Sequence, residues 1–539
     1  MEFKISTDSL NIFLVSIMSI PFGAMHVSFG VHAFNNSLSI SKKNKANSSS
    51  LNNSYNDVMS QWGLDMINIE DAWMLIEGKD SVRIGVVDTG VDSDHEDLQD
   101  NLKIDYDVCF SPYYNTSMQD FSGHGTHVTG IIGATNNSFG INGVCKHASI
   151  TPYRVVELPY LYEEPWNVSA CIQSLNDAEE EGISVVNFSG SYFDFDNDFF
   201  GAFVDYSGLV VCAAGNHSQD NDLYPSNSYP STFPLDNIIS VGASNENDLP
   251  ADFSNYGETT VDLFAPGVDI YSTLPLDNYD SYDGTSMAAP FVTGTIGLMK
   301  SINPNLSNYQ IKSILILTAD VSDDFENLCV SGGRLNSYAA VKASIPTLSY
   351  GNNGSIQDLE TNDFQWYRLN TSNSGSYSIS STGNLNLSAH LYLDPLMSPI
   401  ASATPDNSGN FSISFNSFIN NQIFYLKVTN NSNYSSGSYS LYYSSSHTHH
   451  YNDHYLNAGS KHRAFCSCGA STLQSHSMTF DPNTNLLTCI LCGATQMSPF
   501  SCSSFESFVG NDSMLYSDGT IILSDFDNNE QSLSALFNN

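Results

Sequence analysis

The sequence predicts an α/β protein in which helices cover both faces of a parallel β-sheet, followed by a β-sandwich and a small Cys/His-rich module. Two different patterns of apolar and polar residues along the chain support this order. Between residues 57 and 345, continuous Val- and Ile-rich runs alternate with helical stretches, which is typical of parallel strands buried on both faces. Between residues 350 and 445, apolar and polar residues alternate, which is typical of antiparallel strands with one buried face.

Five short apolar runs in the first part are expected to be the strands of the parallel sheet. They are Val82–Val87, Ser149–Val156, Ile183–Phe188, Leu209–Ala214 and Ile238–Ala243. Two longer stretches, Val168–Glu181 and Met287–Ser301, are expected to be helices. In the second part, clusters of Asn, Ser and Gly separate the alternating runs and predict the turns of a β-sandwich.

The length and charge of the chain limit what it can be. Its 539 residues exceed one compact domain and suggest about two to four. With 17 Lys and Arg against 57 Asp and Glu, the formal net charge is −40. Such a charge repels phosphate backbones, so we expect no nucleic-acid partner. A hydrophobic fraction of 41% is enough for large buried cores and excludes a wholly disordered chain.

Residues 1–33 are expected to form a signal peptide or an anchor. The apolar run Ile12–Ala24 has the length of a signal-peptide core and is shorter than a membrane span. Small residues at Val31–Ala33 offer a cleavage site, although the leader before the run lacks the usual positive charge. An uncleaved anchor and an ordinary buried segment are the alternatives. Residues 34–56 are then an Asn/Ser-rich linker, and we expect the protein to be secreted or at the cell surface.

Two motifs place an acid and a histidine where chemistry is expected. The first predicted strand runs into Asp88–Asp92 (DTGVD), so Asp88 lies at the carboxyl edge of the sheet, where such folds place their sites. A turn or capping Asp is the alternative. The motif His124–Gly130 (HGTHVTG) predicts a closely packed helix whose first turn presents His124. His127, three residues along, is expected to be structural.

A third motif begins another predicted helix. Gly284–Pro290 (GTSMAAP) places Ser286 at the positive end of the helix dipole, with backbone N–H groups nearby to bind an oxyanion. A plain helix-capping Ser is the alternative. Each motif alone is ambiguous, but the three together, in the order Asp88, His124 and Ser286, predict nucleophilic catalysis.

The order and the strings of these motifs resemble the subtilisin-like serine proteases, or subtilases, over residues 57–343. The resemblance implies a subtilisin-like fold and a peptidase whose Ser286 attacks a peptide carbonyl. His124 would be the general base and then the acid that protonates the leaving amine, and Asp88 would orient the imidazole. Asn216, in Ala213–Asn216 (AAGN), matches the family's side-chain donor to the oxyanion.

Residues 135–141 (TNNSFGI) resemble the high-affinity calcium loop of the same family. By this resemblance, oxygens of six residues bind the ion: Gln61, Asp97, Thr135, Asn137, Phe139 and Ile141. Asp97 would supply a carboxylate and Asn137 an amide oxygen, while Thr135, Phe139 and Ile141 would supply carbonyls. Oxygen-only ligation suits Ca²⁺, and a plain Asn-rich turn is the alternative.

Other stretches match or depart from the subtilase pattern. Asn255–Gly257 and Phe264–Gly267 match family landmarks that we expect to be structural. Phe188–Ser191 (FSGS) has Gly190 where the family usually has a large apolar residue in one wall of the substrate cleft. About 20 residues separate the predicted signal from the peptidase part, too few for the folded prodomain that subtilases commonly carry. We therefore expect the protein to fold unaided with the help of calcium, or to rely on another element.

The predicted β-sandwich, residues 350–445, loosely resembles the prepeptidase carboxyl-terminal domain found behind secreted proteases. Such a domain implies attachment to a surface or a substrate. A spacer that only shields the peptidase part is the alternative.

Residues 447–502 form the Cys/His-rich module, and residues 503–539 an acidic tail. Two short cysteine pairs in the module resemble zinc knuckles: Cys466, Cys468, Cys489 and Cys492. The first pair has one intervening residue instead of two, and an exported chain can also form disulfides. The sequence therefore leaves one structural zinc ion and two disulfides as alternatives.

Taken together, the motifs predict a secreted, calcium-stabilised serine endopeptidase that acts on polypeptide substrates through an acyl-enzyme. The main alternative is an adhesin or other binding protein whose subtilase domain is catalytically silent. The complete set of four catalytic side chains favours the enzyme, because catalysis needs all of them together.

Overall fold

The computed structural model describes residues 61–103, 119–156, 166–193, 195–225, 228–433 and 436–445, together with six strands between His454 and Met497. The predicted signal segment, the linker and the acidic tail lie outside these residues. Among the helices that are described, none is long and apolar enough to cross a membrane.

An eight-stranded sheet forms the centre of the first part. Its strand order is β2-β1-β3-β4-β5-β6-β10-β9, and all neighbours are parallel except β9 and β10. The strands are β1 (Arg83–Asp88), β2 (Ser149–Arg154), β3 (Val185–Phe188), β4 (Leu209–Ala213), β5 (Ile238–Ser244), β6 (Leu263–Pro266), β9 (Asp320–Val321) and β10 (Gly333–Arg334). The five predicted strands are confirmed to within two residues at each end. The sequence pattern does not predict β6, β9 and β10, because two to four residues are too few to show a period.

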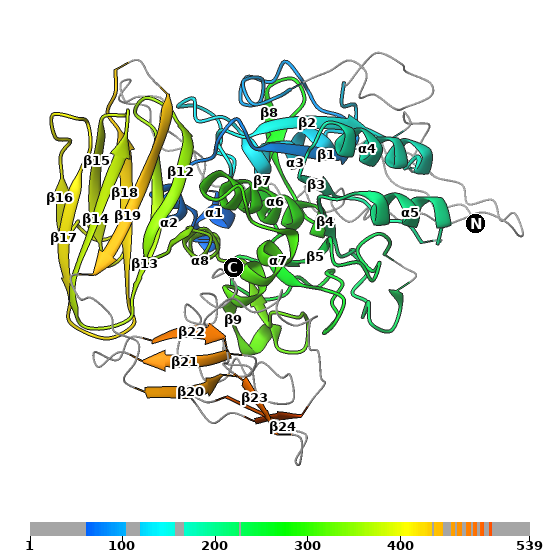
Figure 1. The fold of residues 1–539 in the computed structure, drawn as a ribbon. Coiled ribbons are helices and arrows are strands. Elements are labelled where there is room, and N and C mark those ends of the chain that lie inside the picture. Colours follow the sequence, from blue (N-terminus) through cyan, green and yellow to red (C-terminus); the bar gives the residue numbers. More distant parts are fainter. Residues whose placement is uncertain are drawn as a thin grey trace, which may run out of the picture.

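Helices cover both faces of this sheet, as predicted (Figure 1). One face packs in a large core with α1 (Trp62–Met66), α2 (Ile69–Trp73), α3 (His124–Gly133), α6 (Thr285–Ile302), α7 (Asn308–Leu317) and α8 (Ser337–Ala343). The opposite face packs with α4 (Val168–Glu180) and α5 (Asn197–Asp205) in a second core rich in aromatic side chains. Both predicted helices are present, as α4 and α6. Almost every residue of α6 is buried, since the helix runs through the middle of the first core.

The topology of the sheet fixes where a site can form. The chain passes from β1 to its neighbour β2 on one side and then to β3 on the other side of β1. The carboxyl ends of β1 and β3 therefore flank the point where the strand order reverses, which is where open α/β sheets bind their ligands.

A two-stranded hairpin of β7 (Ile270–Leu274) and β8 (Asn278–Tyr282) leads into α6. It packs on α3 through two hydroxyl groups: Ser272 Oγ donates to His127 O at 2.7 Å and Thr273 Oγ1 to Thr126 O at 2.8 Å. The hairpin therefore ties the start of α3 to the start of α6.

The second part is a β-sandwich of two sheets around one core, with the orders β11-β13-β18-β15-β16 and β12-β19-β14-β17. The strands are β11 (Thr347–Leu348), β12 (Gly351–Leu359), β13 (Phe364–Thr371), β14 (Gly375–Gly383), β15 (Leu387–Tyr392), β16 (Ala401–Ala403), β17 (Ser412–Ser417), β18 (Gln422–Asn430) and β19 (Gly437–Ser445). Buried and more exposed residues alternate along β15 and β17, as the sequence pattern predicts. All pairings are antiparallel except that of β11 with β13.

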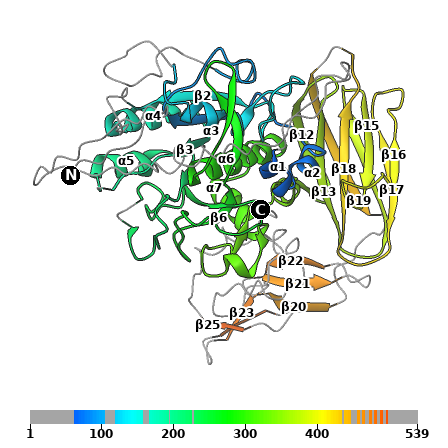
Figure 2. The same cartoon turned by 180° about the vertical axis from the view of Figure 1, so that it is seen from behind.

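The sandwich packs directly on the first part, beside α2 and α8 (Figures 1 and 2). Trp366 and Tyr425 are buried within the large core of the α/β part, at 2% and 3% exposure. Two ion pairs flank this contact: Lys79 with Asp363 at 2.9 Å, and Lys342 with Asp394 at 2.7 Å. The sandwich is therefore joined to the α/β part by shared apolar side chains as well as by the chain itself.

The last six described strands form two small antiparallel sheets. They are β20 (His454–Ala458), β21 (Lys461–Phe465) and β22 (Ser471–Ser475) in one sheet, and β23 (Met478–Asp481), β24 (Leu486–Cys489) and β25 (Thr495–Met497) in the other.

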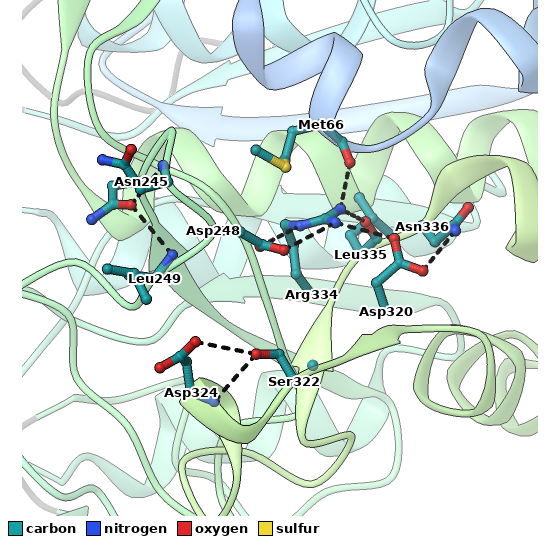
Figure 3. Close-up of polar contacts among 12 residues, drawn as sticks. Met66, Asn245, Asp248, Leu249, Asp320, Ser322, Asp324, Arg334, Leu335 and Asn336 are labelled. Carbon is teal, nitrogen blue, oxygen red and sulfur yellow. Dashed lines mark hydrogen bonds and ion pairs between the residues drawn. The ribbon is translucent and has the colours of Figure 1, made fainter.

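Arg334, on β10, holds the beginning of the described chain against the edge of the large sheet (Figure 3). Its side chain is 5% exposed. The guanidinium pairs with Asp248 at 2.7 Å and with Asp320 at 3.1 Å, and it donates to the carbonyls of Met66 and Leu335. Because Met66 ends α1, one buried cation links α1 to the loop after β5 and to β9.

Candidate active site

Asp88 and His124 meet at the carboxyl edge of the sheet. Asp88 is the last residue of β1 and is 1% exposed, while His124 is the first residue of α3 and its side chain is 25% exposed. Asp88 Oδ1 lies 2.7 Å from His124 Nδ1 and also accepts from Thr89 N at 2.8 Å. Because an ionised carboxylate only accepts, this contact places the proton on Nδ1. The imidazole is thus oriented by a buried acid while it remains partly open to solvent.

His127 lies on the same helix but is fully buried, as the sequence predicts for a structural residue. Its ring stacks on Tyr282, with centroids 4.5 Å apart, and its Nε2 lies 3.2 Å from Asp280 O. Burial, followed by the nearby charge of His124, lowers the pKa of His127 from 6.5 to about 3. His127 therefore stays neutral in the folded protein at pH values where an exposed histidine would be charged.

This lowered pKa gives a prediction for stability. Between pH 6.5 and about 3 the unfolded chain binds a proton at His127 that the folded chain does not, so the free energy of unfolding falls as the pH drops through this window. We expect His127→Phe, which keeps a stacked ring, to lose less stability than the parent over the same window. Thermal melts of both chains, each carrying Ser286→Ala, measure the difference. Parallel curves would contradict the prediction.

Ser286 is the second residue of α6, a helix that packs against α3 and against β3 and β4. Its Oγ donates to Ser189 O at 3.1 Å, and its carbonyl accepts from Ser189 Oγ at 2.9 Å. That carbonyl needs an outside donor, because Pro290, four residues later, has no N–H to continue the helical ladder. The residue after β3 therefore fixes both the side chain and the backbone of Ser286.

Asn216 and the start of α6 bring two N–H donors close together. Asn216 Oδ1 accepts from the N and the Oγ1 of Thr285, both at 2.9 Å, which fixes which end of the amide is oxygen. A Cβ placed on Gly284 would lie 3.5 Å from Asn216 Nδ2 and 3.5 Å from Ser286 N, so both nitrogens lie near the same point. Gly284 N donates to Gly267 O at 2.8 Å. The stretch Phe264–Gly267 therefore holds the residue that precedes α6. Converging N–H groups beside a helix start are suited to bind an oxyanion.

Asn255, the other landmark, holds the loop that carries Asn216. It is fully buried. Its Oδ1 accepts from His217 N at 2.9 Å, and its own N donates to Gly215 O at 2.8 Å. Asn255 therefore fixes the residues on either side of Asn216. The sequence marked Asn255 and Gly267 only as structural, and it gave no role to the Thr285 and Ser189 hydroxyls, because these contacts join segments far apart in the chain.

Trp166 explains the glycine at position 190. A Cβ on Gly190 would lie 2.3 Å from the indole ring of Trp166, which is far closer than carbon atoms can approach. The ring also packs on Phe188, at 5.0 Å between centroids, and Trp166 is 7% exposed. The volume that a side chain at position 190 would take is therefore filled by Trp166, two residues before α4, and the sequence alone could not show this replacement.

Asp97 organises the predicted calcium loop. Its Oδ1 accepts from Asn137 Nδ2 at 2.8 Å, and its Oδ2 accepts from Ile141 N at 2.8 Å and from Tyr279 OH at 2.9 Å. Burial, followed by the hydrogen bond to Asp97, raises the pKa of the Tyr279 phenol above its ordinary value. Asp97 is fully buried, and none of the ion pairs formed by the described residues includes it.

The other predicted calcium ligands surround the same loop. Gln61 pairs with Asn142, accepting from its N at 2.8 Å and donating to its O at 2.9 Å. Thr135 N donates to the carbonyl of Asp97 at 2.7 Å, while Phe139 N lies 3.3 Å from Asn137 Oδ1. Of the predicted ligands, Asn137 and Ile141 therefore contact the Asp97 carboxylate, and Thr135 contacts the Asp97 carbonyl. Within the described part of the chain, no group of three or more His, Cys, Asp or Glu residues is placed to hold a metal.

The predicted zinc cysteines fall almost entirely outside the described residues. This is true of Cys466, Cys468 and Cys492, while Cys489 is the last residue of β24.

Comparison with known proteins places this geometry in context. Residues 79–336 match the family model described as the subtilase family. Thermitase of Thermoactinomyces vulgaris is 36% identical over 296 residues, which cover 52% of this chain and 96% of thermitase. Subtilisin E of Bacillus subtilis (strain 168) is 35% identical over 247 residues, or 44% of this chain and 60% of that protein.

A third relative is much longer. Subtilisin-like protease 2 of Plasmodium falciparum (isolate 3D7) is 35% identical over 258 residues, which cover 45% of this chain and 19% of that protein. The chain thus spans about a fifth of the length of this relative.

Proposed function

Since this chain belongs to the subtilase family, we propose that it is a secreted or cell-surface serine endopeptidase that hydrolyses polypeptides through an acyl-enzyme. The observation that carries the proposal is the 2.7 Å contact between His124 and the buried Asp88, beside the helix whose second residue is Ser286. The sheet, α3 and α6 each supply one member of this set, so the arrangement depends on the whole fold.

In the first half of the reaction, Ser286 Oγ would attack the peptide carbonyl while His124 removes its proton through Nε2. Asp88 would keep Nδ1 protonated and stabilise the imidazolium that forms. The Asn216 Nδ2 and Ser286 N donors would bind the oxyanion of the tetrahedral intermediate. In subtilisin itself, removing the Asn donor costs about 10²–10³ in turnover.

In the second half, His124 would give its proton to the leaving amine, and the C–N bond would break to leave an ester on Ser286. Water, deprotonated by His124, would then hydrolyse this ester and regenerate the free serine. Every step thus uses side chains and backbone N–H groups of this chain.

Hydrolysis of denatured casein by the purified protein tests the proposal. We expect cleavage that a serine-directed covalent inhibitor abolishes, and a mass increase of one inhibitor on the peptide containing Ser286. Absence of both cleavage and labelling would favour the catalytically silent binding protein.

We also propose that the Asp97 loop binds one Ca²⁺ ion. A buried carboxylate with no cationic partner among the described residues is costly, and an oxygen-rich loop around it suits a hard cation. Turning the Asn137 amide, whose oxygen and nitrogen differ little in shape, would aim its oxygen beside that of Asp97. The ion would stabilise the fold and take no part in the chemistry.

Removal of calcium should therefore lower the melting temperature. A ligand at about 100 times its dissociation constant stabilises the native state by about 2.7 kcal/mol, so we expect excess chelator to lower the melting temperature by about 5–10 °C. Asp97→Asn, which keeps the shape but removes the charge, should lose this response.

Asp222 provides the matched control for that experiment. It accepts hydrogen bonds from Thr259 and Thr260 in another loop, so Asp222→Asn should keep the full response to chelator. A melting temperature of the parent that excess chelator leaves unchanged would remove calcium from the proposal.

For residues 447–502 we keep one structural zinc ion, held by Cys466, Cys468, Cys489 and Cys492, as a proposal from the sequence. Metal analysis and intact mass of the full chain distinguish it from two disulfides, which would show four missing protons and no metal.

A further inference from the structure

The buried carboxylate of Asp120 lies at the start of the helix that carries His124. Asp120 is 2% exposed. Its Oδ1 accepts from Ser122 N at 3.0 Å and from Gly123 N at 2.8 Å, and its Oδ2 accepts from Thr126 N at 2.8 Å and from Thr126 Oγ1 at 2.7 Å. Its partners therefore lie on both sides of His124 in the chain.

The same carboxylate reaches the end of β1 through Thr89. Thr89 Oγ1 donates to Asp120 Oδ1 at 2.8 Å and accepts from Gly125 N at 2.9 Å. Thr89 N donates at 2.8 Å to Asp88 Oδ1, the oxygen that lies 2.7 Å from His124 Nδ1. A closed set of hydrogen bonds thus links Asp120 to both members of the proposed acid–histidine pair.

The end of β1 and the start of α3 are packed so closely that the helix has little freedom to shift. A Cβ on Gly125 would lie 2.2 Å from Gly90 O, so α3 touches the turn after β1 directly. Gly123, just before the helix, has a φ of 87°, which other residues adopt only with strain. The first N–H groups of a helix need acceptors. Asp120 accepts from one N–H of the first turn of α3, that of Thr126, and from the N–H groups of the two residues before His124.

We propose that Asp120 is a positioning residue for the peptidase reaction, holding the start of α3 against the end of β1 so that the His124 imidazole keeps its place relative to Asp88. This inference rests on the proposed function, because it assigns the residue an effect on that reaction. Displacing a catalytic group by about 1 Å can lower a rate about 10²-fold, so a positioning residue can have a large effect without touching substrate.

The charge of Asp120 adds an electrostatic effect. Within the described part of the chain, the other titratable groups near the start of α3 are Asp88 from β1, His127 from α3 itself, Arg154 from β2 and Tyr282 from β8. Arg154 pairs in register with Asp88, and Tyr282 stacks on His127. A buried negative charge beside the start of α3 favours the imidazolium. Its removal should therefore move the acid limb of the pH–rate profile to lower pH, because His124 would then stay neutral further into acid.

Asp120→Asn tests the inference, since it keeps the size of the side chain but removes the charge and turns one oxygen into an N–H donor that faces other donors. On a small peptide substrate we expect kcat to fall about 10- to 100-fold, with KM within about threefold of the parent and the acid limb at lower pH. Thr89→Val should lower kcat in the same direction, and Thr89→Ser, which keeps the hydroxyl, should restore it.

Asp262 supplies a matched control. It is also a buried carboxylate, at 5% exposure, and it pairs with Lys312 at 3.0 Å and accepts from Ser240 N at 2.9 Å. We expect Asp262→Asn to lower the melting temperature without changing kcat or the pH profile. A purely structural Asp120 would behave in the same way.

The outcomes separate this inference from the proposed function. If the parent is active and labelled at Ser286, but Asp120→Asn keeps kcat and the acid limb within twofold, the positioning role is wrong and the proposed function stands. If Asp120→Asn does not fold, equal kcat values for the parent and Thr89→Val overturn the inference, and a loss restored by Thr89→Ser supports it. A parent chain that is neither active nor labelled contradicts both.

Discussion

Ser286→Ala is expected to fold as the parent does and to lose about 10⁴-fold or more of its turnover, the scale that removal of a triad member has in subtilisin itself. The reason is that the Ser286 hydroxyl is the proposed nucleophile, while the other hydroxyl at the start of α6, that of Thr285, donates to Asn216 Oδ1. The oxyanion donors remain in this variant, so a small residual rate over water is expected. Initial rates on a peptide substrate, with circular dichroism and a thermal melt, provide the measurement.

Ser301 offers a control on the same helix. Its Oγ donates to Gly297 O at 2.7 Å, at the far end of α6 from Ser286. Ser301→Ala should therefore change stability slightly and leave turnover as it is. A Ser286→Ala chain that keeps even a tenth of the parent rate would mean that the proposed nucleophile is wrong.

The parallel sheet and the position of its acid could be read from the sequence because they depend on local patterns. A buried parallel strand shows as a run of Val and Ile, and Asp88 directly follows such a run. The motifs around His124 and Ser286 are also short contiguous strings, so each predicts the start of a helix without any distant residue. Asp88 ends β1 and His124 begins α3. In the fold these two ends lie side by side, which allows the 2.7 Å contact between the two side chains.

The supporting contacts could not be predicted, because they join residues distant in the chain. Asn255 reaches the loop of Asn216, and Trp166 fills the volume at Gly190. Asp120 precedes His124 by only four residues, yet its role depends on Thr89, which lies 31 residues away. A single sequence carries no signal for such pairings, and the buried polar side chains that make them look like ordinary turn residues.

The stabilising contacts of Arg334 also join residues that are distant in the chain. Its partners lie 268, 86 and 14 residues away, at Met66, Asp248 and Asp320. The guanidinium donates to three separate segments at once, which an aliphatic side chain cannot do. One residue of a two-residue strand therefore adds polar contacts to the attachment of α1, which also packs in the large core.

Arg334→Met is accordingly expected to destabilise the fold by about 3 kcal/mol, near the lower end of the range for breaking a buried ion pair. The lower end applies because Asp248 and Asp320 are 37% and 40% exposed and can be hydrated when the cation is lost. In a domain of this size the melting temperature should fall by about 6–12 °C, measured in the Ser286→Ala background. Arg83→Met is the matched control: its arginine is 36% exposed and pairs with Glu181 at the surface, so the loss should stay below about 1 kcal/mol. Equal shifts for the two variants would show that Arg334 does not hold α1 in place, and that the buried cation contributes no more than a surface charge.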